Sequence, residues 1–435
     1  MTKPQRTVAL IAAHFPPSNL AAVHRARLLS QHLAEFGWRP IIVTTHWRHY
    51  EEALDCGLAA LVDPALEVIR TAAAPTRPVR LVGDIGIRAL PWHLHALRKL
   101  WRERRIDFAH ITVPSFYSAT LGQLLYRREP LPYGIDYIDP WVNVWPEAEI
   151  KYSKAWLSFQ LGCRLEPWAT RNAALITGVA SGYFEGVLDR NPRLRSTCVT
   201  AAMPYGFSVR DFAAPAVASQ VPTELAAGDA CFHLVYAGAL LPRGRGVLVR
   251  MLEGVAAMKA RGSPAAQRLR LHFIGTGKSP MDPAGHNVLP IAQRLGIPEL
   301  VTEHPHRMAY LDVLANLAHA SGVLILGSTE PHYTPSKVYQ AVQSRRPVLA
   351  VLHEASTAVG VLERSGGGRV IKLAGSALPE PGAIADALET FMAGPYDPER
   401  VDWAAFDAYS ARESARHMAA ALDEALARFR QRASA

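Results

Sequence analysis

Three segments in the second half of the sequence carry residues that could bind a phosphate group. The first is the loop after the apolar segment 232–237, where Gly238, Arg243 and Arg245 stand directly before a predicted helix. Backbone N–H groups and the dipole at a helix N-terminus attract anions, and arginine pairs with phosphate oxygens. A plain strand-to-helix loop with solvated arginines would show the same residues. By itself, this loop leaves both interpretations open.

The second segment is a glycine turn, Gly275, Thr276 and Gly277, which follows the apolar segment 269–274. Glycine has no side chain, so the backbone of this turn can approach a ligand closely. The turn matches neither the Walker phosphate loop nor the glycine fingerprint of dinucleotide-binding domains. It therefore predicts a close backbone contact but no particular ligand.

The third segment runs from Glu330 to Lys337 and leads into a predicted helix, 336–344. Thr334 or Ser336 is expected to cap this helix through its hydroxyl group. Lys337 then lies in the first helical turn, where the helix dipole disfavours a cation unless an anion binds there. A lysine that extends into solvent is the alternative. The position of the lysine favours a phosphate site at this helix end.

Candidate catalytic side chains in the first half stand at the ends of predicted strands. Asp136 and Asp139 are paired acids at the predicted strand 135–138: Asp136 is its second residue and Asp139 directly follows it. His14 stands at the end of the first apolar segment. Either acid could cap a loop or lie in solvent, and Asp139 is the better candidate for catalysis. His14 could contact an acceptor molecule or be an ordinary loop residue.

Alternating strand-like and helix-like segments position these residues, which is typical of parallel sheets with helices on both faces. We expect strands at 7–12, 40–44, 66–69, 108–112, 135–138 and 174–177, then at 232–237, 269–274, 322–326 and 347–352. Helices are expected at 20–36, 246–259, 309–320, 336–344 and 411–432, the first of them closed by Gly37. In such sheets ligands bind beyond the carboxyl ends of the strands, so a cleft between two sheets is the expected site.

The length of 435 residues suggests two domains. The segment 207–229 has the composition of a linker, with two prolines among small and polar residues. We therefore predict an N-terminal acceptor-binding domain over 1–210 and a C-terminal nucleotide-sugar-binding domain over 211–400. A terminal helical region, 401–435, is expected to pack back toward the first domain.

The order of these motifs resembles the GT-B glycosyltransferases, in particular the retaining family-four enzymes that build bacterial polysaccharides. The resemblance rests on "YAGALLPRGRG", "LHFIGTGK" and "EPHYTPSKVYQAVQSRRPVLAV" in the second half, and on "HFPPSNLAAVHRARLLSQHLAEFGWRPIIVTT" and "YGIDYIDPWV" in the first. It covers roughly residues 7–370. It implies an α/β fold with two Rossmann-like parallel-sheet domains that face a central cleft.

The same resemblance implies a role for each candidate residue. Arg245 and Lys337 would neutralise the diphosphate of a nucleotide-sugar donor, and the departing diphosphate is where most charge develops. Glu330 would lie beside the donor sugar, and Asp139 would face the transferred carbon as acid/base or electrostatic partner. The remaining donor-binding residues would be Gly238, Arg243, Gly275, Thr276, Gly277, Ser336 and Gln340.

The sequence departs from the family pattern at three positions. Gln340 stands where the family has a second glutamate, so an amide would bind the ribose hydroxyls. Ala239 stands in place of the first basic residue, which Arg243 could replace. Thr112 stands where a histidine is common. Two alternatives to a transferase therefore remain: a non-catalytic nucleotide-sugar-binding subunit and a nucleotide-sugar 2-epimerase.

Composition narrows the partners further. Four separated cysteines, no signal peptide and no apolar run long enough to span a membrane indicate a reduced, cytoplasmic setting. No metal-binding constellation and no nucleic-acid motif is present, so we expect no metal or other cofactor and no nucleic-acid partner. The resemblance implies two substrates, a nucleotide-sugar donor and a lipid-linked or glycan acceptor.

A local excess of positive charge suggests one more partner. The window from Arg70 to Arg105 holds nine basic and two acidic residues, which is +7 of the net +9. Within it, 88–106 mixes leucines and tryptophans with arginines, as interfacial helices do. We therefore consider an anionic membrane surface as a partner of Arg88–Arg105, with peripheral attachment at the inner face. A helix that covers the sheet with its arginines in water is the alternative.

Overall fold

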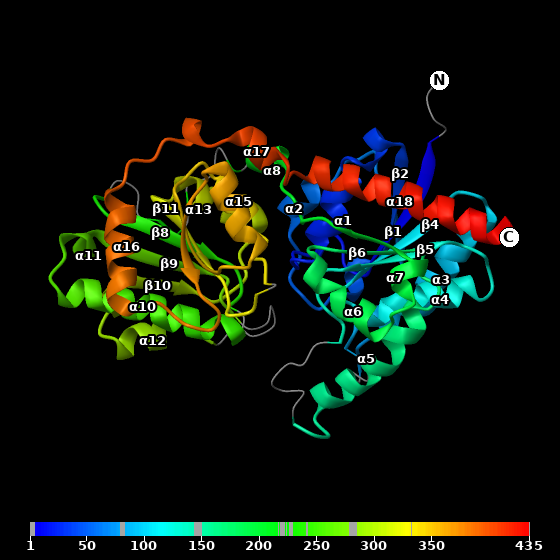
Figure 1. Ribbon diagram of the computed structural model, residues 1–435, viewed down its shortest axis with the longest axis horizontal. Helices are drawn as coiled ribbons and strands as arrows, with labels where there is room; N and C mark the ends of the chain where they lie inside the picture. The colour runs from blue at the N-terminus through cyan, green and yellow to red at the C-terminus, as the bar shows by residue number, and fades with distance from the viewer. Residues whose placement is uncertain are drawn as a thin grey trace. The chain divides into compact units, whose positions relative to one another are not determined.

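The computed structural model describes residues 5–78, 83–142, 150–215, 217, 222, 224–225, 229–240, 242–277, 285–331 and 333–434. The chain forms two compact units (Figure 1). Unit 1 comprises Met1–Gly206 and Ala411–Ala435, and unit 2 comprises Phe207–Ser410. The predicted domains ended at residues 210 and 400, whereas the chain changes units after Gly206 and again after Ser410.

Unit 1 is built on a parallel sheet whose strand order is β3-β2-β1-β4-β5-β6-β7. Alternate residues of its strands point to opposite faces, so Ala9 and Ile11 join one hydrophobic core while Val8 and Leu10 join the other. The strands are β1 (Arg6–Ala12), β2 (Trp38–Thr45), β3 (Glu67–Thr71), β4 (Phe108–Val113), β5 (Tyr133–Tyr137), β6 (Leu175–Gly178) and β7 (Val199–Ala202).

Helices cover both faces of this sheet. They are α1 (Val23–Ser30), α2 (Cys56–Ala60), α3 (Ile85–Arg102), α4 (Thr120–Tyr126), α5 (Lys154–Thr170), α6 (Glu185–Arg190), α7 (Leu194–Thr197) and α18 (Ala411–Ser434). The predicted helix 20–36 is in fact two pieces, α1 and the 3-10 helix η1 (Leu33–Phe36). Gly37 follows η1 with a φ of 85°, as expected of a C-terminal glycine.

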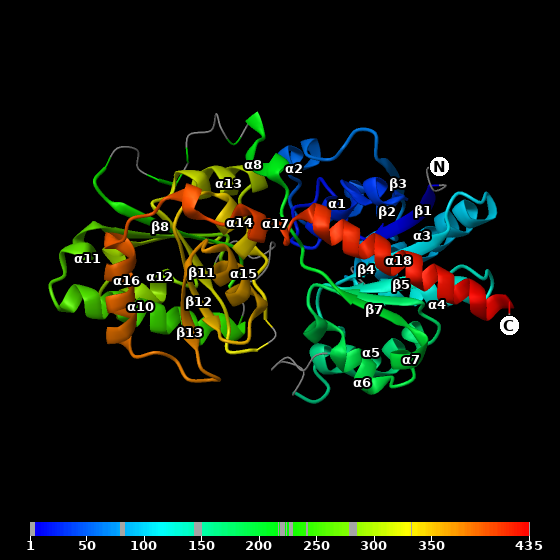
Figure 2. The same ribbon diagram turned by 45° about the horizontal axis from the view of Figure 1, so that its top comes forward.

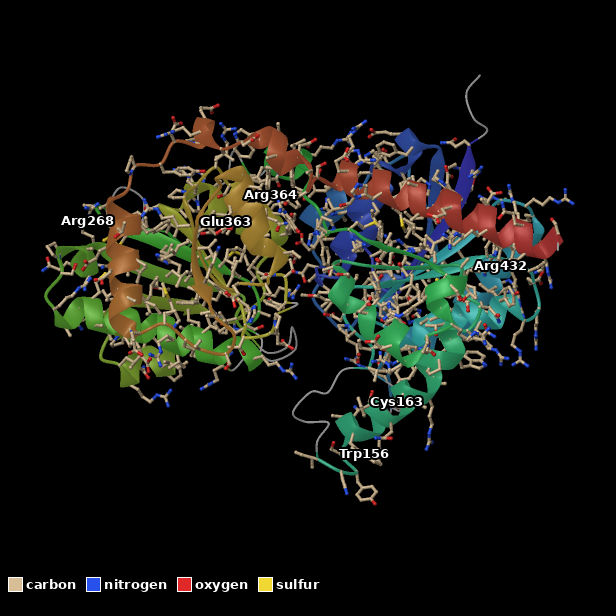
Figure 3. All side chains as sticks on the ribbon, in the orientation of Figure 1. Trp156, Cys163, Arg268, Glu363, Arg364 and Arg432 are labelled. Carbon is tan, nitrogen blue, oxygen red and sulfur yellow. The ribbon has the colours of Figure 1, made fainter. Side chains whose placement is uncertain are left out.

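The last helix, α18, belongs to unit 1 although it follows all of unit 2 in the sequence. It packs against α1, η1 and β7 (Figure 2). Met418 and Leu422 of α18 are fully buried in the core that also holds Leu10 and Trp38. The first part of α5, by contrast, extends away from the sheet, and Trp156 lies near its far end (Figure 3).

The helix that we considered as a membrane-binding element, α3, covers the sheet instead. Its leucines Leu97 and Leu100 are buried in the core, and Leu90, Leu94 and Trp101 pack against that core. Arg88 is buried and donates hydrogen bonds to the carbonyl oxygens of Ala74 (3.0 Å) and His49 (3.1 Å), so its assignment to a surface patch was wrong. Arg102 and Arg105 form ion pairs with Glu129 and Glu67. The leucines that would enter a membrane are therefore in contact with the core of unit 1, although Ile87 and Trp92 of α3 are exposed. Arg80, from the same basic window, lies outside the described residues.

Unit 2 contains a second parallel sheet, with the strand order β10-β9-β8-β11-β12-β13. Its strands are β8 (Phe232–Ala237), β9 (Leu269–Ile274), β10 (Val301–His304), β11 (Gly322–Leu326), β12 (Val348–His353) and β13 (Arg369–Leu373). Its helices are α8 (Val209–Phe212), α10 (Arg245–Ala260), α11 (Pro264–Arg268), α12 (Leu289–Arg294), α13 (Tyr310–His319), α14 (Lys337–Gln343), α15 (Thr357–Ser365), α16 (Pro381–Ala393) and α17 (Trp403–Asp407). Across the described residues, no helix is both long enough and apolar enough to cross a bilayer.

Candidate functional site

A pocket in unit 2 lies where the strand order of the sheet reverses. Strand β8 is the branch point, with β9 on one side and β11 on the other. In open parallel sheets this switch point is where ligands bind, beyond the carboxyl ends of the strands. The pocket is formed by the ends of β8 and β11 and by the loops after them, and its lining residues are Tyr236, Ala239, Leu240, Gly244, Leu326, Gly327 and Tyr333.

The glycine turns and Lys337, which are far apart in the sequence, meet beside this pocket. Gly238 has a φ of 130°, and a Cβ atom there would lie 2.8 Å from the Nζ atom of Lys337. Gly275 has a φ of 71°, and a Cβ atom on it would lie 4.0 Å from the Cα atom of Gly238. The backbone conformation thus favours glycine at position 238, and a Cβ atom there would displace the Lys337 ammonium group. Because Gly238 and Gly275 have no side chains, the two turns can lie next to each other and Gly238 can lie next to the lysine.

The Lys337 side chain extends from the first turn of α14 toward Tyr236. Its Nζ atom donates a hydrogen bond to the Tyr236 hydroxyl at 2.7 Å and lies 4.0 Å from the centroid of that ring. The hydroxyl in turn donates to the carbonyl oxygen of Ala239 at 3.0 Å. No acid in the described part of the chain pairs with Lys337. Tyr236, which sequence reasoning missed, therefore positions the lysine but does not neutralise it.

Burial lowers the pKa of Lys337 to about 7. The side chain is only half-buried by surface area, and the Tyr236 ring favours the charged form. We therefore expect the pKa of Lys337 to lie at or somewhat above this value. An anion bound next to Nζ would raise the pKa of Lys337 again. The lowered pKa of Lys337 is thus what we expect of a partly buried cation without an anionic partner.

Arg243 and Glu330, predicted to have separate roles, form an ion pair with each other. Arg243 belongs to the loop after β8 and Glu330 to the loop after β11, so the pair joins the two loops beside the pocket. Arg245, at the start of α10, is exposed and forms no ion pair with any residue that the structure describes. Gly244 precedes it as N-cap and offers no side chain to the N–H groups of the first turn. This end of α10 can therefore still receive an anion.

Among the other predicted donor-binding residues, some side chains are already hydrogen-bonded within the protein and others are available to a ligand. The buried Thr276 hydroxyl donates to Glu303 at 2.6 Å, and Glu303 also accepts from the backbone N–H groups of residues 287–289. Only the backbone of Thr276 and Gly277 thus remains for a ligand. The Gln340 side chain forms no hydrogen bond within the described residues, so its amide can bind a ligand. The proposed roles of these residues stay predictions.

The predicted hydroxyl cap of α14 is wrong. Ser336 is the N-cap residue, but its side chain accepts no hydrogen bond from the helix. Thr334 bonds instead to the hydroxyl of Thr357 at 2.7 Å. The first turn of α14 therefore lacks a side-chain cap, because Thr334 is bonded to a neighbouring helix.

In unit 1 the two acids near β5 have different environments. Asp136 is fully buried and forms a two-pronged ion pair with Arg25, at 2.8 and 2.9 Å. Burial opposes ionisation of Asp136, but the charge and hydrogen bonds of Arg25 outweigh it and hold the pKa of the carboxyl below its ordinary value. Asp136 is therefore a structural acid and neither a cap nor a solvated residue.

Asp139 lies just after β5 and is exposed. The surrounding protein raises the pKa of its carboxyl by desolvation. Because the side chain is exposed by surface area, this effect should be small, and we expect Asp139 to be ionised at neutral pH. An ionised, accessible carboxylate at a strand end can stabilise positive charge or accept a proton.

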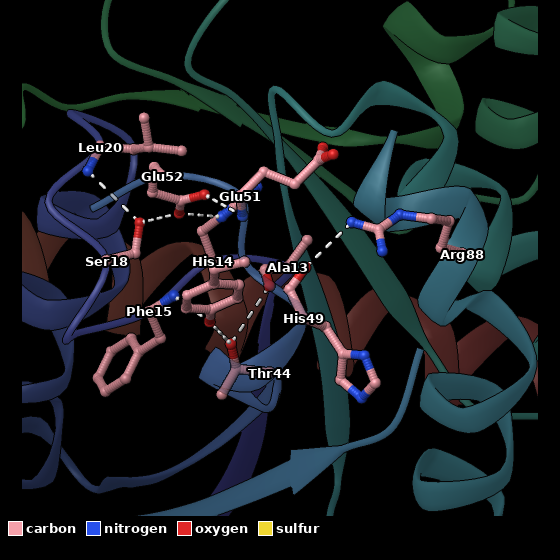
Figure 4. Close-up of polar contacts among 11 residues, drawn as sticks. Ala13, His14, Phe15, Ser18, Leu20, Thr44, His49, Glu51, Glu52 and Arg88 are labelled. Atoms are coloured by element: carbon pink, nitrogen blue, oxygen red, sulfur yellow. Dashed lines mark hydrogen bonds and ion pairs between the residues drawn. The ribbon is translucent and has the colours of Figure 1, made fainter. Parts of the chain in front are cut away.

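His14, after β1, forms a polar cluster with residues that the sequence did not single out (Figure 4). Its Nδ1 atom lies 2.7 Å from Glu52, and the Ser18 hydroxyl donates to the same carboxylate. Burial opposes ionisation of Glu52, but the bonds to His14 and Ser18 prevail and lower the pKa of Glu52. A histidine fixed by a carboxylate at one ring nitrogen presents the other as a proton acceptor.

The sequence matches no family model and no curated protein. Among solved structures, the N-terminal domain of trehalose-6-phosphate phosphatase from Candida albicans is similar at a TM-score of 0.66 and 13% identity, over 98% of both chains. Sucrose-phosphate synthase from Thermosynechococcus elongatus matches at 0.57 and 17%, over 99% of this chain and 98% of that one. The Anabaena protein HepE in complex with UDP-glucose matches at 0.58 and 13%, over 99% and 100%.

The likeness extends over both units and not over one sheet alone. Each unit has a parallel sheet, as the sequence pattern predicted, and the strand order of each sheet contains a switch point. At such low identities a shared fold is what the comparison establishes. The chain has the GT-B fold, with two Rossmann-like domains.

Proposed function

We propose that the protein is a glycosyltransferase that moves a sugar from a nucleoside-diphosphate donor to a lipid-linked or polysaccharide acceptor, with retention of anomeric configuration. One observation carries this proposal: Lys337, without an acidic partner in the described residues, lies against Gly238, which adjoins Gly275 at the switch point of the second sheet. HepE, a protein of the same fold, binds UDP-glucose. The proposed setting is the cytoplasm, at the surface of a membrane.

In this proposal the diphosphate binds over the two glycine turns. Negative charge develops on the diphosphate as its bond to the anomeric carbon breaks, and the Lys337 ammonium and Arg245 stabilise that charge. The Gln340 amide binds the ribose hydroxyls. Glu330, held by Arg243, lies beside the sugar. In unit 1, Asp139 stabilises the positive charge on the transferred carbon or takes the proton of the acceptor hydroxyl.

A thermal-shift panel tests donor binding. UDP-, GDP-, ADP- and TDP-sugars are each added to the full-length protein, with and without EDTA. A ligand at 100 times its Kd stabilises the folded state by about 2.7 kcal/mol, so the correct donor should raise Tm by several degrees. We propose that no metal is needed, so EDTA should leave the shift unchanged. A panel without any shift would contradict the proposal, and loss of the shift in EDTA would contradict its metal-free form.

A second candidate function, a non-catalytic nucleotide-sugar-binding subunit, has specific support. Glu330 is engaged by Arg243, and Gln340 is an amide where the resembled family has a carboxylate. Such a subunit would bind a donor tightly but neither transfer nor hydrolyse it. A nucleotide-sugar 2-epimerase would instead release an altered nucleotide-sugar without acceptor. Chromatography of the donor after incubation with and without acceptor distinguishes the three functions.

The His14–Glu52 pair is proposed to orient the acceptor hydroxyl. Replacing His14 with alanine should lower kcat about 100-fold, within the range for loss of a general base, while the donor-induced Tm shift stays unchanged. Glu52→Gln should have a smaller effect, since it keeps a hydrogen-bond partner for the ring. His32→Ala, at a half-buried histidine that also pairs with a glutamate, is the matched control. Full activity in His14→Ala would exclude this role.

A further inference from the structure

The first part of α5 and the turn before it form an exposed apolar surface on unit 1. We call residues 150–161 the α5 tip. Nine large hydrophobic residues are exposed in the described chain, and four of them lie here. The exposed fractions are 65% for Ile150, 81% for Tyr152, 55% for Leu157 and 43% for Leu161. Exposed apolar residues that gather in one segment usually mark an interaction surface.

These side chains contribute nothing to the interior of unit 1. The core contacts of α5 come from Leu165, Trp168 and the buried Ala169, beyond the α5 tip. Tyr152 and Trp156 instead contact each other, with ring centroids 5.3 Å apart. Tyr152 also has a φ of 65°, a conformation that a bulky residue rarely adopts. The α5 tip is thus held with its apolar groups outward, away from the sheet (Figure 3).

The charges around the α5 tip are positive. Lys151, Lys154 and Arg164 are exposed, and within the described part of the chain none of them forms an ion pair. From 150 to 165 the sequence has no acid; Glu147 and Glu149 precede this stretch, outside the described residues. Glu166 follows, but it is fully buried and pairs with Arg190. The exposed charge therefore complements an anionic partner.

The residue types distinguish between two anionic partners. Aliphatic side chains flanked by Tyr, Trp and Lys are typical of elements that lie at the membrane–water interface. Protein–protein interfaces, including those between identical chains, are depleted in lysine. Two lysines beside the most exposed tyrosine therefore favour a lipid headgroup region over a protein surface.

We propose that the α5 tip binds anionic lipid bilayers. Ile150, Tyr152, Leu157 and Leu161 insert between the headgroups, and Lys151, Lys154 and Arg164 contact the lipid phosphates. This surface replaces that of α3, whose leucines lie in or against the core of unit 1. It does not depend on the transfer reaction: if the chain binds no nucleotide-sugar, the membrane contact still stands or falls by its own test.

Vesicle sedimentation of the full-length protein tests the proposal. Vesicles of phosphatidylcholine alone are compared with an equal mixture of phosphatidylcholine and phosphatidylglycerol. We expect binding to the anionic vesicles that weakens with added salt. The triple variant Tyr152→Ser/Leu157→Ser/Leu161→Ser should bind more than about tenfold more weakly. Each basic residue strengthens such binding about fivefold, so Lys151→Gln/Lys154→Gln/Arg164→Gln should lose up to about 100-fold.

A matched control removes the same kind of exposed residue elsewhere. Ile87→Ser/Trp92→Ser/Val209→Ser changes three exposed hydrophobic residues outside the α5 tip and should bind like the unchanged protein. Unchanged Tm values establish that each variant folds. Absence of binding to anionic vesicles, or equal binding by the apolar triple variant, would overturn the proposal. So would a dimer in solution that the apolar triple variant dissociates, because a second copy would then occupy the surface.

Discussion

Replacing Lys337 with alanine is expected to lower kcat/KM for sugar transfer about 100- to 1,000-fold, as the loss of one preorganised charge-stabilising group does in other enzymes. The reason is local: the structure offers no described acid to Lys337 and supplies only the Tyr236 hydroxyl. The departing diphosphate would be its proper partner. Steady-state kinetics with the donor identified by thermal shift measures the effect.

The pH dependence of donor binding gives the same prediction a second readout. With a pKa of about 7 in the free protein, Lys337 loses its proton as the pH rises above 7. A bound diphosphate raises the pKa of Lys337, so binding above pH 7 must take up a proton. Affinity should therefore fall by up to about tenfold per pH unit between pH 7 and 9 and stay flat below 7. Titration calorimetry over this range measures it.

Two variants control for Lys337. Lys337→Arg keeps the charge, and its guanidinium does not lose its proton, so the fall in affinity above pH 7 should disappear. Lys259→Ala removes an exposed lysine of α10 that pairs with Glu299, and it should change kcat/KM less than about twofold. If Lys337→Ala keeps nearly full activity, the diphosphate does not bind where we propose.

Replacing Asp136 with asparagine is expected to destabilise unit 1 by about 3–5 kcal/mol, because it leaves the Arg25 charge buried without a counter-charge. Arg25 and Asp136 are both fully buried. Arg25 also donates to the carbonyl oxygens of Met203 (2.9 Å) and Pro204 (2.7 Å), and Thr177 donates to Asp136 at 2.6 Å. The pair thus links α1, β5, β6 and the chain after β7.

Calorimetry should show a fall of about 10 °C in the unfolding transition of unit 1. Asp189→Asn, which breaks an exposed pair with Arg195, should cost less than about 1 kcal/mol. Arg25→Met/Asp136→Leu, which removes both charges, should recover much of the loss. An unchanged transition in Asp136→Asn would mean that the buried charge finds another partner.

The strands that could be predicted are those with continuous apolar runs. Segments 232–237, 269–274 and 322–326 were predicted with the bounds that β8, β9 and β11 have. Strands β7, β10 and β13 were missed, because polar or charged residues interrupt their short sequences VTAA, VTEH and RVIKL and leave no continuous apolar run. The helix 20–36 was predicted too long, and Arg25 and Arg27 are buried there although periodicity treats charged residues as solvent-facing.

Some residues of the candidate site could likewise be predicted from the sequence and others could not. Gly238, Gly275 and Lys337 could be found because each follows a predicted strand or begins a predicted helix, and topology brings such positions together. Tyr236 and Glu52 could not, since their roles come from side-chain contacts across long stretches of chain that no local pattern reports. Our prediction of a membrane contact rested on the most basic helix, but charge density alone does not reveal which apolar residues of a helix the fold buries.

The placement of α18 bears on how the protein is synthesised. Met418 and Leu422 complete a core whose other members outside α18 all lie before residue 207, yet the ribosome translates α18 only after all of unit 2. Until then only α1 and η1 supply helical residues to this core, so part of one apolar face of the sheet lies uncovered, a state prone to aggregation. Unit 1 can therefore complete this core only once α18 has been translated.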